Sequence, residues 1–302
     1  MMNNFEQIFQ KITERESKKV AVAVAQDEPV LEAIRDAKVK GIADAILIGD
    51  REEIQLIAAR IGMDLKDFTV IHELDEKQAA LKAVELVSNG KADMLMKGLI
   101  DTASLLKAVL NKEKGLRTGR LMSHVAVFEV PGFDRLLLIT DAAFNMYPDL
   151  KAKIDIIKNA VTVARAIGIE NPKVAPICAV EVVNLDSPAT LDASILSKMN
   201  ERGQILGCVV DGPLSLDTAI SEEAARHKGV SGSVAGKADI ILLPSFEVGN
   251  VMYKTLIYAS NSKNGGILVG TSAPVILTSR SDSHEAKMNS IALAALVAND
   301  KT

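Results

Sequence analysis

The sequence predicts an α/β fold of two domains, with mixed sheets that carry helices on both faces. The chain has 302 residues, about twice the length of a typical domain. Apolar residues make up 48% of it, with only seven Phe, three Tyr and no Trp. The core is therefore built mainly from Ala, Val, Ile and Leu, as in sheets that are buried on both faces. Apolar runs of strand length alternate with segments of helical period, which is the pattern of βαβ units.

Eight apolar runs are expected to be strands, and helices separate most of them. The expected strands are 19–25, 44–48, 69–72, 92–96, 174–180, 205–210, 238–243 and 266–271. The segment 76–89 is typical of the helices, because its apolar residues share one side and Gly90 follows where a helix C-terminus needs glycine. A further helix is expected to begin near Thr102, and another to include Met252 and Leu256.

Two neighbouring strand-like segments break this alternation. The segments 124–131 and 135–142 are separated only by Gly132, Phe133 and Asp134, which are too few for a crossover helix. A hairpin is the natural connection. The sequence therefore predicts an antiparallel pair near the middle of the chain, and with it a mixed sheet.

Composition excludes several classes of partner. The 35 Lys and Arg residues are balanced by 39 Asp and Glu residues, so the basic excess of a nucleic-acid-binding protein is missing. The longest apolar stretches, such as 291–298, are far below the ~20 residues that cross a bilayer. The first residues lack the basic and apolar regions of a secretory signal. We therefore expect a cytoplasmic protein, with Cys178 and Cys208 as buried strand residues rather than as a disulfide or a nucleophile.

Ligands of open α/β sheets bind beyond the carboxyl ends of the strands, and four polar segments follow expected strands. They are Lys97-Gly98-Leu99, Asp211-Gly212-Pro213, the segment 244–250 with Asn250, and the segment 278–282. Two of them also have a purely structural interpretation. A lysine such as Lys97 is more often a solvated strand end, and Asp211 is equally typical of a residue that accepts hydrogen bonds in a turn.

The fourth segment gives the most specific prediction. Asp282 and Glu285 have the spacing of a capping box, so a helix is expected to begin there. Its buried side is expected to hold Met288, Ile291, Ala292, Ala295 and Leu296. Ser279, Arg280 and Ser281 would lie beside the positive end of this helix, which suits an anion. The guanidinium adds donors for phosphate, although Arg280 is also consistent with pairing to a surface carboxylate.

Several well-known site motifs are missing from the sequence. No G-x-G-x-x-G follows the first strand, and neither H-E-x-x-H nor C-x-x-C occurs. The segment 232–237 is not a phosphate loop, because Ala238 replaces the required hydroxyl and the segment precedes a strand. We therefore expect no metal site.

Three blocks of the sequence together resemble the phosphate acetyl/butyryltransferase family. They are the block from Gly236-Lys237-Ala238-Asp239 to Asn250, the block Asp211-Gly212-Pro213-Leu214 and the pair Ser279-Arg280. The likeness runs through nearly the whole chain, with Lys97-Gly98 and Thr140-Asp141-Ala142 in the expected order. It implies a fold similar to that of isocitrate and isopropylmalate dehydrogenases, with two domains around a cleft and the C-terminal helix returning to the first. The expected domains are 1–135 with 275–302, and 136–274.

The resemblance also implies an activity. This is the reversible transfer of a short acyl group between CoA and inorganic phosphate, by direct attack in a ternary complex, and overall likeness favours butyryl. CoA is then a substrate, no cofactor is tightly bound, and the chain forms a homo-oligomer. One alternative is an NAD- and metal-dependent hydroxy-acid decarboxylating dehydrogenase of the same fold, although 211–217 offers it only Asp211 and Asp217. The other is a non-catalytic sensor of CoA or acyl phosphate.

The resemblance assigns roles to the polar segments. Ser279 and Arg280 are expected to hold phosphate or stabilise the tetrahedral oxyanion, with Lys97 or Lys107 as a second cation. Lys107 appears where acetyl-transferring relatives use an arginine, and lysine lacks the bidentate fork. The expected further substrate contacts are Asp211, Asn250 and Ser281.

The resemblance leaves the proton acceptor open. The position that holds a catalytic aspartate in acetyl-transferring relatives is Ala286 in this chain. Glu285 and Asp282 are the local substitutes, and His284 is a third candidate. The expected catalytic residues are therefore Ser279, Arg280, Glu285 and Asp282.

Overall fold

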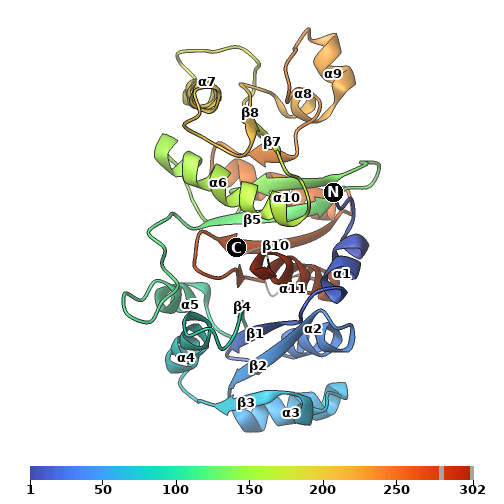
Figure 1. The fold of residues 1–302 in the computed structure, drawn as a ribbon, viewed down its shortest axis with the longest axis vertical. Coiled ribbons are helices and arrows are strands. Elements are labelled where there is room, and N and C mark those ends of the chain that lie inside the picture. Colours follow the sequence, from blue (N-terminus) through green and yellow to red (C-terminus); the bar gives the residue numbers. More distant parts are fainter. Residues whose placement is uncertain (279–281, 300–302) are drawn as a thin grey trace. The chain divides into compact units, whose positions relative to one another are not determined.

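The computed structural model describes residues 1–278 and 282–299, which form two compact units (Figure 1). The central unit consists of Met1–Asn4 and Leu121–Lys263, and the terminal unit of Phe5–Arg120 and Asn264–Thr302. These boundaries differ from the expected ones at 135 and 274. The strand before residue 135 pairs with the strand after it, and the strand before residue 274 pairs with the strand that follows.

The terminal unit contains a mixed sheet of six strands. They are β1 (Lys18–Ala23), β2 (Ala43–Gly49), β3 (Thr69–His72), β4 (Met94–Lys97), β10 (Lys263–Val269) and β11 (Val275–Ile276). Their order is β3-β2-β1-β4-β11-β10, and only the β10–β11 pair is antiparallel. The carboxyl ends of β1, β4 and β11 therefore meet at one edge of the sheet.

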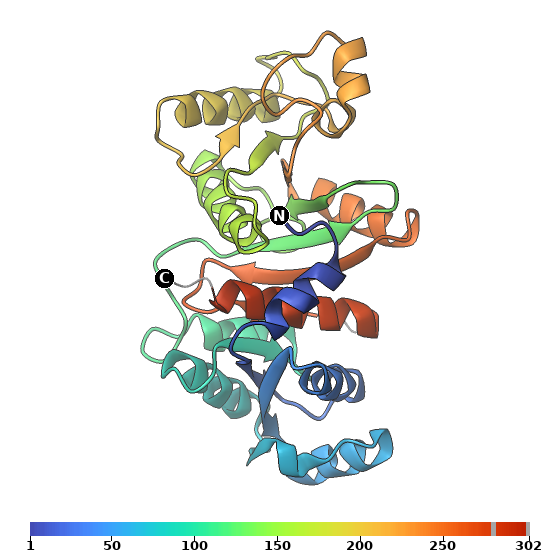
Figure 2. The ribbon, with the colours of Figure 1, turned by 45° about the vertical axis from the view of Figure 1, so that its right-hand side comes forward.

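Helices cover both faces of this sheet. They are α1 (Phe5–Thr13), α2 (Glu28–Val39), α3 (Arg51–Ile61), α4 (Glu76–Ser88), α5 (Thr102–Val109) and α11 (His284–Asn299). The helices α4 and α5 contact each other, whereas α2 contacts both α3 and α11. The helix α11 also packs against α1, as Figure 2 shows, and against β1, β4 and β11. It is buried on all sides from Ala286 to Val297, which confirms the predicted buried positions.

Aspartates begin most helices of the terminal unit. Asp27, Asp50, Asp75 and Asp101 each accept a hydrogen bond from a backbone amide in the first turn of α2 to α5. The helix α11 differs, because its Ala286 amide donates to the Ser283 hydroxyl at 3.1 Å. The helix therefore begins one residue later than a cap at Asp282 would place it, since Ser283 accepts this hydrogen bond.

The central unit also contains a mixed sheet. Its strands are β5 (Ser123–Glu129), β6 (Leu136–Thr140), β7 (Lys173–Pro176), β8 (Val209–Val210) and β9 (Ile240–Leu242), in the order β5-β6-β9-β7-β8. The antiparallel β5–β6 hairpin confirms the prediction, and the remaining pairs are parallel. Its helices are α6 (Leu150–Ala166), α7 (Pro188–Glu201), α8 (Leu216–Ile220), α9 (Glu222–His227) and α10 (Phe246–Tyr258).

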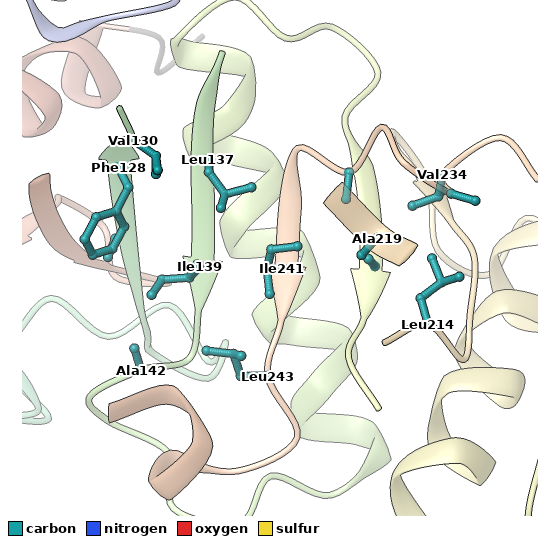
Figure 3. Packing of buried hydrophobic residues seen from close by; sticks show 14 of the residues in the cluster. Phe128, Val130, Leu137, Ile139, Ala142, Leu214, Ala219, Val234, Ile241 and Leu243 are labelled. Carbon is teal, nitrogen blue, oxygen red and sulfur yellow. The ribbon is translucent and has the colours of Figure 1, made fainter. Parts of the chain in front are cut away.

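The core of the central unit follows the alternation of its strands. Phe128, Ile139 and Ile241 project to one face, where they join a cluster that includes Tyr253 of α10 (Figure 3). The ring of Tyr253 meets Phe128 edge-on, with centroids 5.4 Å apart. Because successive side chains of a strand point to opposite faces, the residues between these pack on the other face, where α6 contacts β5, β6 and β9. The α/β class with mixed sheets is therefore confirmed.

Two expected strands are shorter than predicted, which displaces both cysteines. Cys178 lies just after β7 and Cys208 just before β8. Both are buried and free, and burial raises the pKa of each thiol to about 11. Among the described residues, no helix has the length and apolarity needed to span a bilayer.

Candidate functional site

A cavity of about 240 Å³ opens in the terminal unit where β1, β4 and β11 end. Polar and charged side chains lie beside apolar ones in its lining, which comes from the loops after these strands and the first turns of α2 and α11. The lining residues are Asp27, Pro29, Val30, Lys97, Gly98, Thr278 and Lys287. This is the sheet edge at which an α/β fold binds ligands, and it includes the predicted Lys97-Gly98 segment.

Backbone contacts fix the turn that presents Lys97. Gly98 is buried, and a Cβ at this position would lie 2.1 Å from the Val24 carbonyl oxygen. That carbonyl accepts a hydrogen bond from the Leu99 amide at 2.7 Å. Val24 itself adopts a left-handed conformation with φ 59°, which is rare for a β-branched residue. The close crossing of these two loops therefore requires glycine at 98 and holds Lys97 at the cavity.

Lys287 is a second cation at the cavity, and the sequence analysis missed it. Its side chain is only 2% exposed, and its Nζ donates a hydrogen bond to the Asp282 carbonyl at 2.6 Å. Burying an ammonium group costs free energy unless it gains hydrogen bonds or an opposite charge. A signal was available in the sequence, because Lys287 precedes the predicted core residue Ile291 by one helical repeat.

Asp27 contributes a carboxylate to the same cavity. It is the N-cap of α2, and its Oδ1 accepts a hydrogen bond from the Val30 amide at 3.1 Å. No other lining residue in the described part of the chain is acidic. Because Asp27 satisfies the Val30 amide, and Pro29 has no N–H, the start of α2 offers few backbone donors to a ligand.

The cavity therefore combines two ammonium groups, the Thr278 hydroxyl and one carboxylate. Ammonium and hydroxyl donors suit the oxygens of a small oxyanion. The carboxylate suits an oxyanion that keeps a proton of its own. Among the described residues, no group of His, Cys, Asp and Glu side chains is arranged to hold a metal ion.

Three of the predicted site residues, Ser279, Arg280 and Ser281, lie outside the described residues. Of the two residues that flank this segment, one lines the cavity and the other accepts a hydrogen bond from a lining residue. Thr278 lines it, and the carbonyl of Asp282 binds the buried Lys287.

The remaining candidates of the terminal unit do not line the cavity. Asp282 is half-buried, whereas Glu285 is exposed in the first turn of α11. Lys107 is exposed on α5. His284 instead pairs with Asp36 of α2, with Nε2 3.1 Å from Oδ2. The pKa of Asp36 is lowered by the hydrogen bond from Arg35 and, to a smaller extent, by His284.

The other two predicted contacts belong to the central unit. Asp211 directly follows β8, and burial raises the pKa of its half-buried carboxyl. A Cβ on Gly232 would lie 2.2 Å from the Asp211 Oδ2, so glycine lets the carboxylate approach this loop. Asn250 is half-buried in α10. The residue before it, Gly249, packs so closely on the Asp141 carbonyl that a Cβ would lie 2.6 Å from it.

The central unit also contains a partly buried ion pair that the sequence did not indicate. Lys153, in the first turn of α6, places its Nζ 2.6 Å from the Asp192 Oδ2 of α7. Both residues line a cavity of about 10 Å³ near the carboxyl ends of β7 and β9. This volume holds about one water molecule, so the pair ties two helices together and leaves no room for a substrate.

Comparisons with known proteins match nearly the whole chain to a single family. The family model for "Phosphate acetyl/butaryl transferase" matches residues 4–80 and 72–295. The "Phosphate butyryltransferase" of Clostridium acetobutylicum is 71% identical over 301 residues, which cover 100% of both chains.

Solved structures agree with these sequence matches. A branched-chain phosphotransacylase from Enterococcus faecalis superposes with a TM-score of 0.84 at 35% identity, covering 93% of this chain and 99% of its own. A 4-hydroxythreonine-4-phosphate dehydrogenase from Klebsiella pneumoniae shares the fold alone, with a TM-score of 0.52 at 15% identity over 93% of this chain and 100% of its own. The dehydrogenase-like fold and the resemblance noted in the sequence are thus confirmed. The chain belongs to the phosphate acetyl/butaryl transferase family.

Proposed function

We propose that this chain catalyses the reversible transfer of an acyl group between CoA and inorganic phosphate, and that butyryl is its acyl group. Family membership and the 71% identity to a phosphate butyryltransferase support this assignment. CoA acts as a substrate and not as a resident cofactor.

One structural observation carries the proposal. The cavity where β1, β4 and β11 end is lined by Lys97 and Lys287, and its lining residue Thr278 immediately precedes Ser279 and Arg280. Two lysines at one small cavity provide the positive charge that favours binding of an anion there. Inorganic phosphate is the substrate of this family that fits such a cavity by size and charge.

The reaction needs no covalent intermediate on the protein, because a thioester is already an activated carbonyl compound. A phosphate oxygen attacks the thioester carbonyl carbon, so a C–O bond forms and a tetrahedral oxyanion develops. The C–S bond then breaks, and its electron pair leaves with sulfur. Monohydrogen phosphate brings one proton, and the CoA thiolate gains one, so butyryl-CoA and phosphate give butyryl phosphate and CoA in balance.

The chain's own residues bind and orient the two substrates in this scheme. Arg280 and Ser279 hold phosphate or stabilise the oxyanion, and Lys97 and Lys287 neutralise the phosphate charge. Lys107 is a further cation on the same unit. Contacts to the remainder of the substrates come from Ser281, Asp211 and Asn250.

Asp282 and Glu285 are the proposed acceptors for the CoA thiol proton in the reverse direction. A thiol with a pKa near ~8.5 is a few per cent ionised at pH 7, so its ionisation costs about 2 kcal/mol. Positioning two reactants lowers the activation free energy by roughly 7–11 kcal/mol. Each good hydrogen-bond donor to the oxyanion lowers it by about 3–4 kcal/mol. Binding and orientation therefore contribute more to the rate than the base.

The deciding assay follows thiol release from butyryl-CoA with and without phosphate. Release that depends on phosphate, together with formation of butyryl phosphate, supports the transfer reaction. Saturable binding without release would indicate a sensor instead. Formation of NADH from a 2-hydroxy acid with NAD and Mg²⁺ would indicate a dehydrogenase. Comparing kcat/KM for acetyl-, propionyl-, butyryl- and valeryl-CoA tests the preference for butyryl.

The proposal extends to the setting in which the enzyme works. We place it in the cytoplasm as a homo-oligomer that meets its small-molecule substrates in solution, with no nucleic acid or membrane partner. Sedimentation equilibrium of the full chain tests the assembly, and a monomer at micromolar concentration would contradict it.

A further inference from the structure

We infer that Asp27 makes the cavity of the terminal unit selective for an oxyanion that carries a proton, so that phosphate is admitted and sulfate is rejected. The inference rests on the proposed function, because it concerns the phosphate site of the same reaction. It assigns a specificity role to a residue whose visible function is to cap a helix.

The observation behind it is a carboxylate among cations. Asp27 lines the cavity together with Lys97 and Lys287. A cavity built only to attract negative charge has no use for a carboxylate, which repels any anion. A site can gain specificity in this way, by including a group that penalises the wrong ligand.

The geometry leaves Asp27 able to accept a further hydrogen bond. Its Oδ1 accepts from the Val30 amide at 3.1 Å, and among the described residues no other donor reaches the carboxylate. An ionised carboxylate has two oxygens and about four acceptor positions. Its remaining capacity faces a cavity whose other polar groups are donors.

A retained proton distinguishes phosphate from sulfate at this carboxylate. Phosphate and sulfate are similar tetrahedral dianions near neutral pH, but phosphate keeps one P–OH group whereas sulfate keeps no proton. The P–OH group donates a hydrogen bond to Asp27, while an unprotonated sulfate oxygen meets the carboxylate as a like charge. Arsenate also keeps a proton, so Asp27 admits it with phosphate.

The variant Asp27→Asn tests this selectivity at nearly constant shape. Asparagine is as good an N-cap as aspartate, so α2 keeps its first hydrogen bond. The amide offers sulfate a donor and removes the negative charge. The matched control is Asp75→Asn, because Asp75 caps α4 by the same contact, accepting from the Gln78 amide at 2.8 Å, but is exposed and does not line the cavity.

The measurement is the KM for phosphate and the inhibition constant of sulfate against phosphate, both in thiol release from butyryl-CoA. Since a hydrogen bond to a charged group contributes about 1.5–3 kcal/mol, Asp27→Asn should raise the KM for phosphate about tenfold or more. We expect sulfate to inhibit this variant at least about threefold more strongly than the wild type, and arsenate to follow phosphate. Asp75→Asn should leave both constants unchanged.

Failure of the proposed function and failure of the selectivity role give different experimental results. If the wild-type protein releases no thiol in the presence of phosphate, the proposed function fails. If it does, but Asp27→Asn leaves the ratio of the two constants unchanged, the selectivity role of Asp27 is overturned and the transfer reaction stands. A melting temperature equal to that of the wild type shows that the variant is folded.

Discussion

Lys97 at the end of β4 and Lys287 in the first turn of α11 line the same cavity, although they come from the two separate segments of the terminal unit's sequence. Lys97 is held by the crossing of the 98–99 turn over Val24, and Lys287 by its hydrogen bond to the Asp282 carbonyl. Neither residue alone creates an anion site. Together they give the cavity two positive charges in a partly buried setting, where charges interact more strongly than in water.

Replacing either lysine with methionine should weaken phosphate binding and leave the affinity for acyl-CoA largely unaffected. Because a hydrogen bond from a charged group contributes about 1.5–3 kcal/mol, the KM for phosphate should rise about 10- to 100-fold in Lys97→Met and Lys287→Met. Steady-state kinetics with each substrate varied in turn provide the measurement. The exposed Lys66 gives the control Lys66→Met, and an equal rise in the KM for butyryl-CoA would contradict the prediction.

Replacing Arg280 with alanine should affect the chemical step. Removing one donor to a tetrahedral oxyanion typically lowers kcat by about 10²–10³, so Arg280→Ala should lose more than about tenfold in kcat and remain folded. Initial rates at saturating butyryl-CoA and phosphate, together with a circular dichroism melt, test both parts. Turnover at the wild-type rate would remove Arg280 from the site.

Gly98 should tolerate no side chain. The Cβ of Gly98→Ala would lie 2.1 Å from the Val24 carbonyl and 2.8 Å from the Ala23 carbonyl, both of which are backbone atoms. The variant should lose more than about 2 kcal/mol of unfolding free energy, as expected when backbone must shift. Gly90→Ala is the comparison, because Gly90 has open space around it but a φ of +70°, which costs alanine about 1 kcal/mol. Urea unfolding should rank Gly98→Ala as the less stable variant, and the reverse order would contradict the clash.

The carboxyl of Asp217 should titrate unusually low. Its hydrogen bond from Ser215 and its contacts with Lys228, whose Nζ lies 2.9 Å from Oδ2, lower its pKa from 3.8 to about 2. Ionised Asp217 therefore stabilises the fold above pH about 4, and this contribution disappears as the pH falls towards 2. Carbon-13 NMR of the carboxyl should show the low pKa in the wild type and a higher one in Lys228→Met. The control Lys198→Met removes a lysine that pairs elsewhere, with Glu201, and should leave Asp217 unchanged.

The sequence predicted the elements of this fold better than their ends. The sequence placed the strand 69–72 and the start of the helix at Thr102 as the structure has them. Hydrophobic periodicity and helix capping, on which these predictions depend, are properties of the local sequence. The strand β11 was missed, because its two paired residues, Val275 and Ile276, are too few for a pattern. The expected strand 205–210 shrinks to Val209–Val210, since Leu206 is exposed and Gly207 adopts a left-handed conformation with φ 81°.

The sequence singled out one residue that lines the cavity, Lys97, and overlooked two others, Asp27 and Lys287. Lys97 could be identified because it directly follows β4. Asp27 looked like any other helix cap, and only the meeting of β1, β4 and β11 shows that it lines a cavity. Lys287 was missed as well, although its spacing to Ile291 places it on the buried side of α11. The roles of Ser279, Arg280, Lys107, Asp211 and Asn250 stay predictions.

The position of α11 determines the order in which the two units mature during synthesis. Nearly all of the central unit is one continuous stretch, 121–263, so its sheet can assemble while later residues are still inside the ribosome. Most of the terminal unit, 5–120, precedes this stretch in the sequence, yet the helix that fills its interior against α1, α2 and β1 follows it. The nascent 5–120 segment therefore waits with an apolar groove exposed to solvent or to chaperones until α11 is made, so the terminal unit is the last to close.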